Sequence, residues 1–186
     1  MFDIVNEDGS SAGYQAGRED VHKKGLWHKT VHVWVMNSQG NLLLQKRAMT
    51  KETFPGCWDI SCAGHIDAGE TPSRAAIREL EEELGFVVDE RELVFLFSVI
   101  QKFSFGNQPV IDNEIVDVFL LQKDCSTSKI NYNREEISDI MEIRPVQLIE
   151  DTRLNLPVIA QRHIEYERLI EFLSTIHISG HQSDSD

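Results

Sequence analysis

Four glutamates stand close together in the segment Arg78-Glu79-Leu80-Glu81-Glu82-Glu83. In a helix, Glu79, Glu82 and Glu83 fall at positions i, i+3 and i+4, which places their carboxylates on one face, whereas Glu81 points away. Like charges at this spacing destabilise a helix unless cations lie between them. Carboxylate oxygens without histidine or cysteine partners suit hard ions, so the pattern indicates a site for Mg²⁺, with Mn²⁺ as an alternative. An acidic run alone is more often a solvated surface, so the decision depends on the residues around it.

The glutamates belong to a segment whose ends and apolar side chains all predict a helix. Thr71 suits the N-cap, Pro72 the first helical position and Gly85 the position after the last turn. Apolar side chains recur at i, i+3 and i+7 as Ile77, Leu80 and Leu84. This stripe would anchor the opposite side of the helix and hold the carboxylates on a rigid base.

Alternating and β-branched runs predict strands around this helix. The expected strands are, in chain order, Val31–Val35, Asn41–Gln45, Trp58–Ala63, Leu93–Gln101, Ile115–Leu121 and Met141–Pro145. The first two are joined by a short loop that contains glycine and are expected to form a hairpin. A second amphipathic helix is expected over Val158–Ile176, whereas residues 134–139 receive no assignment.

Strands interleaved with two helices predict a single α/β domain over residues 27–176. An N-terminal extension over residues 1–26 precedes it, with a short strand and turn followed by a segment, 10–26, that receives no assignment. Residues 177–186 are polar, have little to bury and are expected to form a mobile tail.

The bulk composition narrows the class of protein. The chain has 186 residues, long enough for one core, and a formal net charge of −13. A nucleic-acid polymer is not an expected partner, because no basic stripe offsets this charge. The three cysteines, Cys57, Cys62 and Cys125, form no CxxC pair and fit a reducing compartment. No apolar run approaches the roughly 18 residues of a membrane span, so a cytoplasmic protein without a membrane partner is expected.

The spacing around the glutamates resembles the signature of a known enzyme family. Gly64 is followed after five residues by Glu70, and after seven more by the run Arg78–Phe86, with every specified position filled. This pattern resembles the Nudix box. The resemblance implies a Nudix-like α/β/α sandwich with a mixed central sheet. It also implies a Mg²⁺-dependent hydrolase that cleaves a diphosphate bond in a nucleoside-diphosphate derivative or a related small molecule, and it leaves a homodimer open.

The resemblance carries over to individual residues. Glu79, Glu82 and Glu83 match the metal-ligand carboxylates of the family. The main-chain carbonyl of Ala63 or Gly64 matches a position where the loop commonly adds a ligand. Ions held there would neutralise the diphosphate oxygens, orient an attacking water and stabilise the leaving phosphate.

Two further roles concern the loop before the predicted helix and the proton that the attacking water loses. Glu70 and Arg78 match the pair that ties the loop to the helix in this family. A guanidinium can hold a carboxylate through two parallel hydrogen bonds, so Arg78 would keep the loop closed. Hydrolysis also benefits from a general base near the attacking water. The position of this residue varies in the family, and Glu83 and Glu114 are both candidates.

Four residues outside the glutamate set are candidates for binding the substrate. Lys46 and Arg47 follow the strand at 41–45 and could bind a terminal phosphate. Trp58, together with Phe54, could stack on a base. A charged pair on an edge strand and aromatic residues of the core would explain the same observations. His65, beside the first glycine of the Nudix-like pattern, is the fourth candidate.

A second resemblance supplies the main alternative. Segments rich in histidine and aromatic residues resemble isopentenyl-diphosphate isomerase, a relative that shares the fold: Trp27-His28, His32-Val33-Trp34, Phe54–Trp58 and Gly64-His65. That enzyme binds a metal through histidine and glutamate and protonates an alkene with a cysteine. The residues at positions similar to its metal site are His22, His28, His65, Asp112 and Glu114.

One position separates the two activities. The isomerase cysteine stands directly before the Gly-His pair, where this chain has Ala63. Cys62 lies one residue earlier, and a shift of one residue in a strand turns a side chain to the other face. Hydrolysis is therefore the preferred prediction. A nucleotide-binding module without turnover is the third alternative, and the complete set of glutamates disfavours it.

Overall fold

The core of the protein is a mixed, seven-stranded sheet. The computed structural model describes residues 1–105, 110–153 and 162–180. The strands follow the spatial order β5-β4-β3-β8-β7, with β6 paired to β3 and β9 paired to β4. Their bounds are β3 Trp27–Met36, β4 Leu42–Arg47, β5 Trp58–Asp59, β6 Cys62–His65, β7 Leu93–Phe105, β8 Val110–Gln122 and β9 Ile137–Ile143. The β3–β8 pair is parallel and the other pairs are antiparallel.

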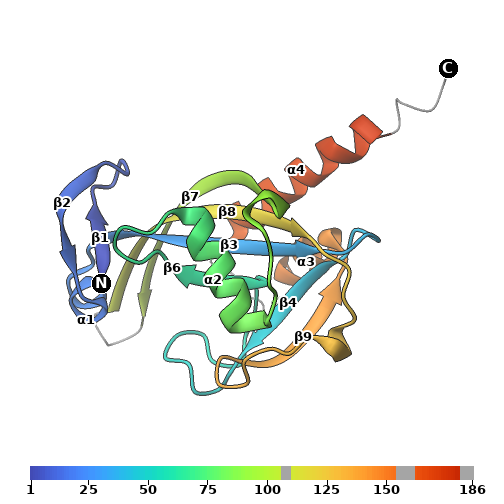
Figure 1. Ribbon diagram of the computed structural model, residues 1–186, viewed down its shortest axis with the longest axis horizontal. Helices are drawn as coiled ribbons and strands as arrows, with labels where there is room; N and C mark the ends of the chain where they lie inside the picture. The colour runs from blue at the N-terminus through green and yellow to red at the C-terminus, as the bar shows by residue number, and fades with distance from the viewer. Residues whose placement is uncertain (106–109, 154–161, 181–186) are drawn as a thin grey trace.

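Helices cover both faces of this sheet (Figure 1). Helix α2 (Pro72–Leu84) packs Leu80 and Leu84 into one apolar cluster, which includes Val31 and Val33 of β3. Helices α3 (Pro145–Arg153) and α4 (His163–Gly180) contribute to a second cluster, which includes Trp34. Successive residues of β3 thus feed opposite clusters, as the two-residue repeat of a strand requires. The expected α/β/α sandwich is confirmed. None of the helices described is long and apolar enough to cross a membrane.

The N-terminal segment forms a small unit at one end of the sheet (Figure 1). Strands β1 (Phe2–Val5) and β2 (Ser11–Ala16) pair in antiparallel fashion, and helix α1 (Arg18–Lys24) follows. Phe2, Ile4 and Val21 are its buried residues. Residues 10–26 receive no assignment from the sequence, because this unit has few apolar residues of its own and packs against β3 and β8 of the main domain.

Helix α2 has the bounds that its residue types predict. The side chain of Thr71 caps the helix by accepting a hydrogen bond from the Arg74 N–H at 3.4 Å, and Pro72 occupies the first position. Gly85 adopts φ of 68°, a left-handed conformation that glycine tolerates, and its N–H donates to the Glu81 carbonyl at 3.0 Å. Because both ends are fixed, the helix presents its acidic face in a defined orientation.

Several predicted strands are confirmed with different bounds. The hairpin exists as β3 and β4, and the two later strands are longer than predicted, at 13 residues each in β7 and β8. The single strand predicted over 58–63 is wrong, since β5 and β6 are separate there. Between them, Ser61 Oγ accepts from the Val35 N–H and donates to the Leu43 carbonyl, so the chain changes partner from β4 to β3.

The C-terminal part also differs from prediction. The strand expected at 141–145 begins earlier, at Ile137, and Pro145 instead opens helix α3, where a missing N–H costs nothing. Helix α4 begins at His163, and the first residues of the predicted helix, 158–161, lie outside the described residues. The helix continues through Gly180, so residues 177–180 of the predicted tail are helical, whereas 181–186 lie outside the described residues.

Candidate functional site

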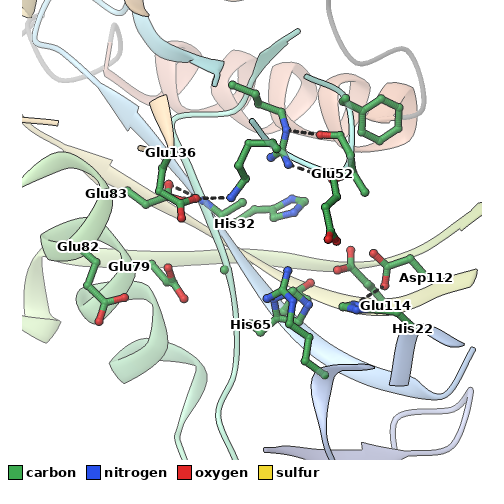
Figure 2. Close-up of a pocket in the computed structure, with 18 of the residues that line it drawn as sticks. His22, His32, Glu52, His65, Glu79, Glu82, Glu83, Asp112, Glu114 and Glu136 are labelled. Atoms are coloured by element: carbon green, nitrogen blue, oxygen red, sulfur yellow. Dashed lines mark hydrogen bonds and ion pairs between the residues drawn. The ribbon is translucent and has the colours of Figure 1, made fainter. Parts of the chain in front are cut away.

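A cavity of about 660 Å³ opens beside α2 and the end of β6. This volume lies within the range of about 300–1,000 Å³ that is usual for small-molecule sites. Side chains from the N-terminal unit, β3, β6, α2, β8 and the loop at 48–57 line it. Figure 2 shows two groups of side chains on opposite sides: Glu79, Glu82, Glu83 and Glu136 on one, and His22, Asp112 and Glu114 on the other.

The glutamates of α2 differ sharply in environment, although all three line the cavity. Glu83 is 8% exposed and its Oε2 accepts hydrogen bonds from Gln45 Nε2 at 3.0 Å and from the Ala63 N–H at 3.4 Å. The Glu79 side chain is 14% exposed and that of Glu82 58%. Glu83 thus faces the cavity from a buried position and Glu79 from a half-buried one, whereas Glu82 stands at the edge of the cavity.

Burial and mutual repulsion both act on this carboxylate pair. Burial, with the charge of Glu79 next, raises the pKa of Glu83 to about 8. Burial also raises the pKa of Glu79, against the opposing effect of Arg78. A bound divalent cation would offset the cost of burying the carboxylates, because it replaces their lost hydration. It would also offset their repulsion, because it lies between the like charges. The donor set, all oxygen, fits Mg²⁺ or Mn²⁺.

Gly64 leaves the space that Glu79 occupies. In the β3–β6 pair Gly64 lies opposite Val31, on the side that faces α2. A Cβ atom added to Gly64 would lie 2.0 Å from Glu79 Cδ and 2.1 Å from Oε1, far inside contact distance. The close approach of helix and strand therefore requires glycine here, for reasons of space. It also brings the main chain at 63–64 next to the carboxylates, where a carbonyl ligand was predicted.

Arg78 connects the loop before α2 to the helix. Its Nε and Nη2 donate to the two Glu70 oxygens at 3.1 and 3.0 Å. Its Nη1 donates to Glu79 at 2.7 Å and to Glu82 at 3.3 Å, and Nη2 also donates to the His65 carbonyl at 2.9 Å. These are the contacts expected of a residue that ties loop to helix, and they orient two of the three glutamates.

A fourth carboxylate on this side escaped the sequence analysis. Glu136 lines the cavity and forms an ion pair with Lys51 of the loop at 48–57. It belongs to the segment 134–139 that received no assignment. Its signal in the sequence is a short acidic stretch, which resembles an ordinary polar turn, and only the folded chain brings it to α2.

The predicted substrate-binding residues separate into two groups. Arg47 lines the cavity, where its Nε and Nη2 donate to the carbonyl and hydroxyl of Thr53 at 2.9 and 3.0 Å. Lys46 and Trp58 do not line it: Lys46 Nζ lies 5.8 Å from the Trp58 ring, which packs against the cluster under α4. Their predicted role is not supported, because alternation along β4 and β5 turns them away. Phe54 does line the cavity.

The other side of the cavity gathers histidines and carboxylates. His28 Nε2 lies 3.6 Å from Asp112 Oδ1 and 3.9 Å from Glu114 Oε1, and His22 Nε2 lies 3.7 Å from Asp112 Oδ1. In two overlapping groups, His22–His28–His65 and His28–Asp112–Glu114, the possible ligand atoms lie within 4.8 Å of one another. His28 Nε2, His65 Nε2 and Asp112 Oδ1 are buried and lack a hydrogen-bond partner. Such a set fits a metal ion, which would satisfy all three atoms.

The N-terminal unit completes this histidine side. The Phe2 ring stacks on His65 at 4.7 Å, and His65 stacks on His28 at 5.2 Å. Arg18 Nη1 lies 3.4 Å from His65 Nδ1, and His22 comes from α1. The extension is therefore part of the cavity wall. Glu114, predicted as a possible base, lies on this side, where burial and then Asp112 raise its pKa to about 8.

The floor of the cavity is a buried network anchored by α4. His32 Nδ1 lies 2.7 Å from Glu165 Oε2, and Arg162 Nη1 lies 2.7 Å from His32 Nε2. Arg162 Nε lies 2.9 Å from Asp59 Oδ1, and its Nη1 donates to Gln101 at 3.0 Å. These partners hold the floor rigid. None of these residues except His32 carried a sequence motif that could have pointed to the site.

Cys62 and Ala63 face opposite sides of β6, as the sequence predicted. Cys62 is fully buried with Leu80 and Leu84 in the cluster under α2, and burial raises the pKa of its thiol. Ala63 lines the cavity instead. The position from which a thiol could reach a substrate thus carries a methyl group.

Comparison with known proteins gives one consistent family. The NUDIX domain model matches residues 26–164. Nudix hydrolase 3 of Arabidopsis thaliana is 34% identical over 93% of this chain, which spans only 20% of the Arabidopsis protein. Isopentenyl-diphosphate Delta-isomerase of Serratia proteamaculans is 39% identical over 63% of this chain and 60% of its own. The crystal structure of a Deinococcus radiodurans protein superposes with a TM-score of 0.67 at 26% identity, covering 84% of this chain and 91% of that one. The chain belongs to the Nudix family.

Proposed function

We propose that the protein hydrolyses a diphosphate bond in a small molecule, with Mg²⁺ or Mn²⁺ held by Glu79, Glu82 and Glu83. The observation that carries the proposal is a pair of carboxylates on one face of α2 that line the cavity, Glu83 buried and Glu79 half-buried against Gly64. Such a pair is costly without a cation and useful with one. Membership of the Nudix family supports the same activity in general.

Each residue on the acidic side has a role in this reaction. Glu79, Glu82 and Glu83 would hold the ion, with a carbonyl of Ala63 or Gly64 nearby, and Arg78 fixes the orientation of Glu79. The bound ion would supply neutralisation of phosphate charge and Lewis-acid activation of the attacked phosphorus.

The substrate would meet cations and an aromatic ring on the adjoining wall. Arg47 and Lys51 both line the cavity and offer donors to phosphate oxygens. Phe54, on the same loop as Lys51, offers an aromatic surface of the kind on which a nucleobase stacks. The cavity volume of about 660 Å³ lies within the range of about 300–1,000 Å³ that is usual for small-molecule sites. We therefore place the substrate in the class of nucleoside-diphosphate derivatives.

A screen of diphosphate compounds with Mg²⁺ or Mn²⁺, read by mass for released monophosphates, tests the proposal. The wild-type protein is expected to cleave at least one compound, and Glu82→Gln to lower the rate about 100-fold through weakened ion binding. Glu81→Gln is the matched control, because Glu81 is the exposed neighbour that does not line the cavity. Equal activity of the Glu82 and Glu81 variants would contradict the proposed metal site.

The histidine side favours a second, softer ion, and this is our second candidate function. Imidazole nitrogens suit Zn²⁺ and related ions better than Mg²⁺. We expect the protein to bind one Zn²⁺ here, and Asp112→Asn to weaken binding about tenfold or more, because it removes one carboxylate charge. Calorimetry with Zn²⁺ alone measures this, with His163→Gln, outside the cavity, as control. Unchanged Zn²⁺ affinity in Asp112→Asn would refute the site.

The isomerase alternative is tested separately. Conversion of isopentenyl diphosphate to dimethylallyl diphosphate needs a proton donor beside the alkene, and Cys62 is buried away from the cavity. We expect no conversion by the pure protein, with either ion, in a product assay by chromatography. If the protein instead converted isopentenyl diphosphate at a rate comparable to diphosphate hydrolysis, the histidine side would be the principal catalytic centre.

A further inference from the structure

A carboxylate that does not belong to α2 faces the three helix glutamates. Glu136 lines the same cavity, and Figure 2 shows it on the side of Glu83, opposite Glu114. Burial is the main cause of the raised pKa of both Glu79 and Glu83. The negative charge of Glu136 raises these two pKa values further. Its side chain is 37% exposed, so water reaches it.

The main chain fixes Glu136 relative to α2. The Asn133 N–H donates to the Glu83 carbonyl at 2.8 Å, which joins this turn to the end of the helix. The Glu136 carbonyl accepts from the Ala48 N–H at 2.8 Å, and the Ile137 N–H donates to the Asn133 carbonyl at 2.8 Å. These bonds hold the Glu136 backbone between the helix and the loop at 48–57, so its carboxylate has a defined place over the acidic side.

The helix glutamates and Glu136 have different kinds of partner. Glu79 and Glu82 accept from Arg78, and Glu83 accepts from Gln45. A carboxylate that coordinates an ion has little remaining basicity for a proton. Among the described residues, the Glu136 carboxylate has one hydrogen-bonding or ionic partner, Lys51, which also lines the cavity. Lys51 is a flexible cation for which substrate phosphate is a competing partner.

We infer that Glu136 is the general base of the hydrolysis, held by Lys51 in the free protein and released when Lys51 turns to the substrate phosphate. This inference rests on the proposed function. A water oxygen attacks one phosphorus while its proton passes to a Glu136 oxygen. The new P–O bond forms as the bridging P–O bond breaks, and its electron pair leaves with the departing phosphate. Glu136 then returns the proton to solvent.

Glu136→Gln tests the base directly. Glutamine keeps the shape and an acceptor for Lys51 but cannot take a proton, so kcat should fall about 100-fold or more. The KM and the affinity for Mn²⁺, measured by electron paramagnetic resonance, should stay within a factor of two of wild type. Glu135→Gln is the matched control, since Glu135 is the exposed neighbour outside the cavity, and it should leave all three quantities unchanged.

The Lys51→Met variant tests whether Lys51 releases Glu136 when it turns to the substrate phosphate. The variant should raise KM about tenfold, through the lost phosphate contact, and keep most of kcat, because the base is then unmasked. A fall of kcat without a rise of KM would mean that Lys51 only positions Glu136 and would refute release.

The outcomes separate this inference from the proposed function. Full kcat in Glu136→Gln, or a parallel loss of Mn²⁺ affinity, overturns the base assignment while Glu82→Gln still reports on the metal site. If the wild-type protein cleaves no diphosphate compound, the proposed function fails and the assignment of Glu136 fails with it.

Discussion

Replacing Glu83 with glutamine is expected to abolish most activity and to stabilise the metal-free protein at the same time. The rate should fall about 1,000-fold, since a lost ion ligand costs several kcal/mol of transition-state stabilisation and about 1.4 kcal/mol corresponds to a factor of ten. Stability should rise because glutamine fills the same buried space, 8% exposed, without a charge. Both effects are expected if Glu83 is an ion ligand, because its burial is then unfavourable when the ion is absent.

The free energy of unfolding is expected to depend on pH through the buried carboxyl group of Glu83. An unfolded glutamate has a pKa near 4.5, and burial raises that of Glu83 to about 8 in the folded protein. Between these values the folded protein keeps a proton that the unfolded chain has released, so the free energy of unfolding falls as pH rises. The change is complete above about pH 8. Glu114, with a pKa also raised to about 8, contributes a similar slope that remains in the variant.

Urea denaturation in the presence of a chelator, near pH 4.5 and near pH 8, measures the difference. The wild-type protein should lose stability between these points, and Glu83→Gln should lose less. Glu81→Gln, an exposed site on the same helix, should follow the wild-type slope. A Glu83→Gln protein with wild-type activity, or with the wild-type slope, would show that Glu83 is not the buried ligand described above.

Gly64→Ala is expected to have the second-largest effect, about 100-fold on the rate, although it adds a single methyl group. The added Cβ would lie 2.0 Å from Glu79 Cδ, so the carboxylate must leave its place beside the strand. A misplacement of about 1 Å can cost about 100-fold where orientation matters. Mn²⁺ affinity should fall with the rate, because Glu79 is displaced from the ion and not from the substrate.

Gly17→Ala is the matched control for Gly64→Ala. Gly17 has an ordinary φ of −75°, and an added Cβ would meet nothing nearer than Met1 Sδ at 3.9 Å. The control should leave the rate and the Mn²⁺ affinity unchanged. Kinetics at saturating Mn²⁺ add a second check, since partial rescue at high ion concentration is expected only if the defect lies in ion binding. Wild-type kinetics for Gly64→Ala would disprove the close packing of Gly64 and Glu79.

The parts of the site that the sequence predicts are those encoded locally. Helix α2 carries its own cap, stripe and stop signal, so the relative positions of its glutamates follow from helical geometry alone. The contact of Glu70 with Arg78 spans eight residues and follows from a short loop that returns to the helix. The opposite faces of Cys62 and Ala63 follow from the two-residue repeat of a strand.

The parts that the sequence does not predict depend on distant contacts. Glu136 and Phe2 reach the cavity through pairings that no local pattern encodes, the former beside α2 and the latter on His65. For Trp58 the sequence leaves both base stacking and a core position open, and packing against the cluster under α4 determines its place. Arg162, directly before α4, and Glu165 of α4 both contact His32, from which they are separated by more than 100 residues in the sequence.

The two groups of candidate ligands on opposite sides of the cavity have a consequence for the divergence of such proteins. The carboxylates on one side come from α2 and the turn at Glu136, and the histidines on the other come chiefly from α1 and β3, with β6 as the shared element. Apart from β6 and its contact with Arg78, the two groups are supported by different elements. A single ancestral scaffold of this kind can therefore give rise to lineages with different chemistry by losing residues on one side, without rebuilding its core.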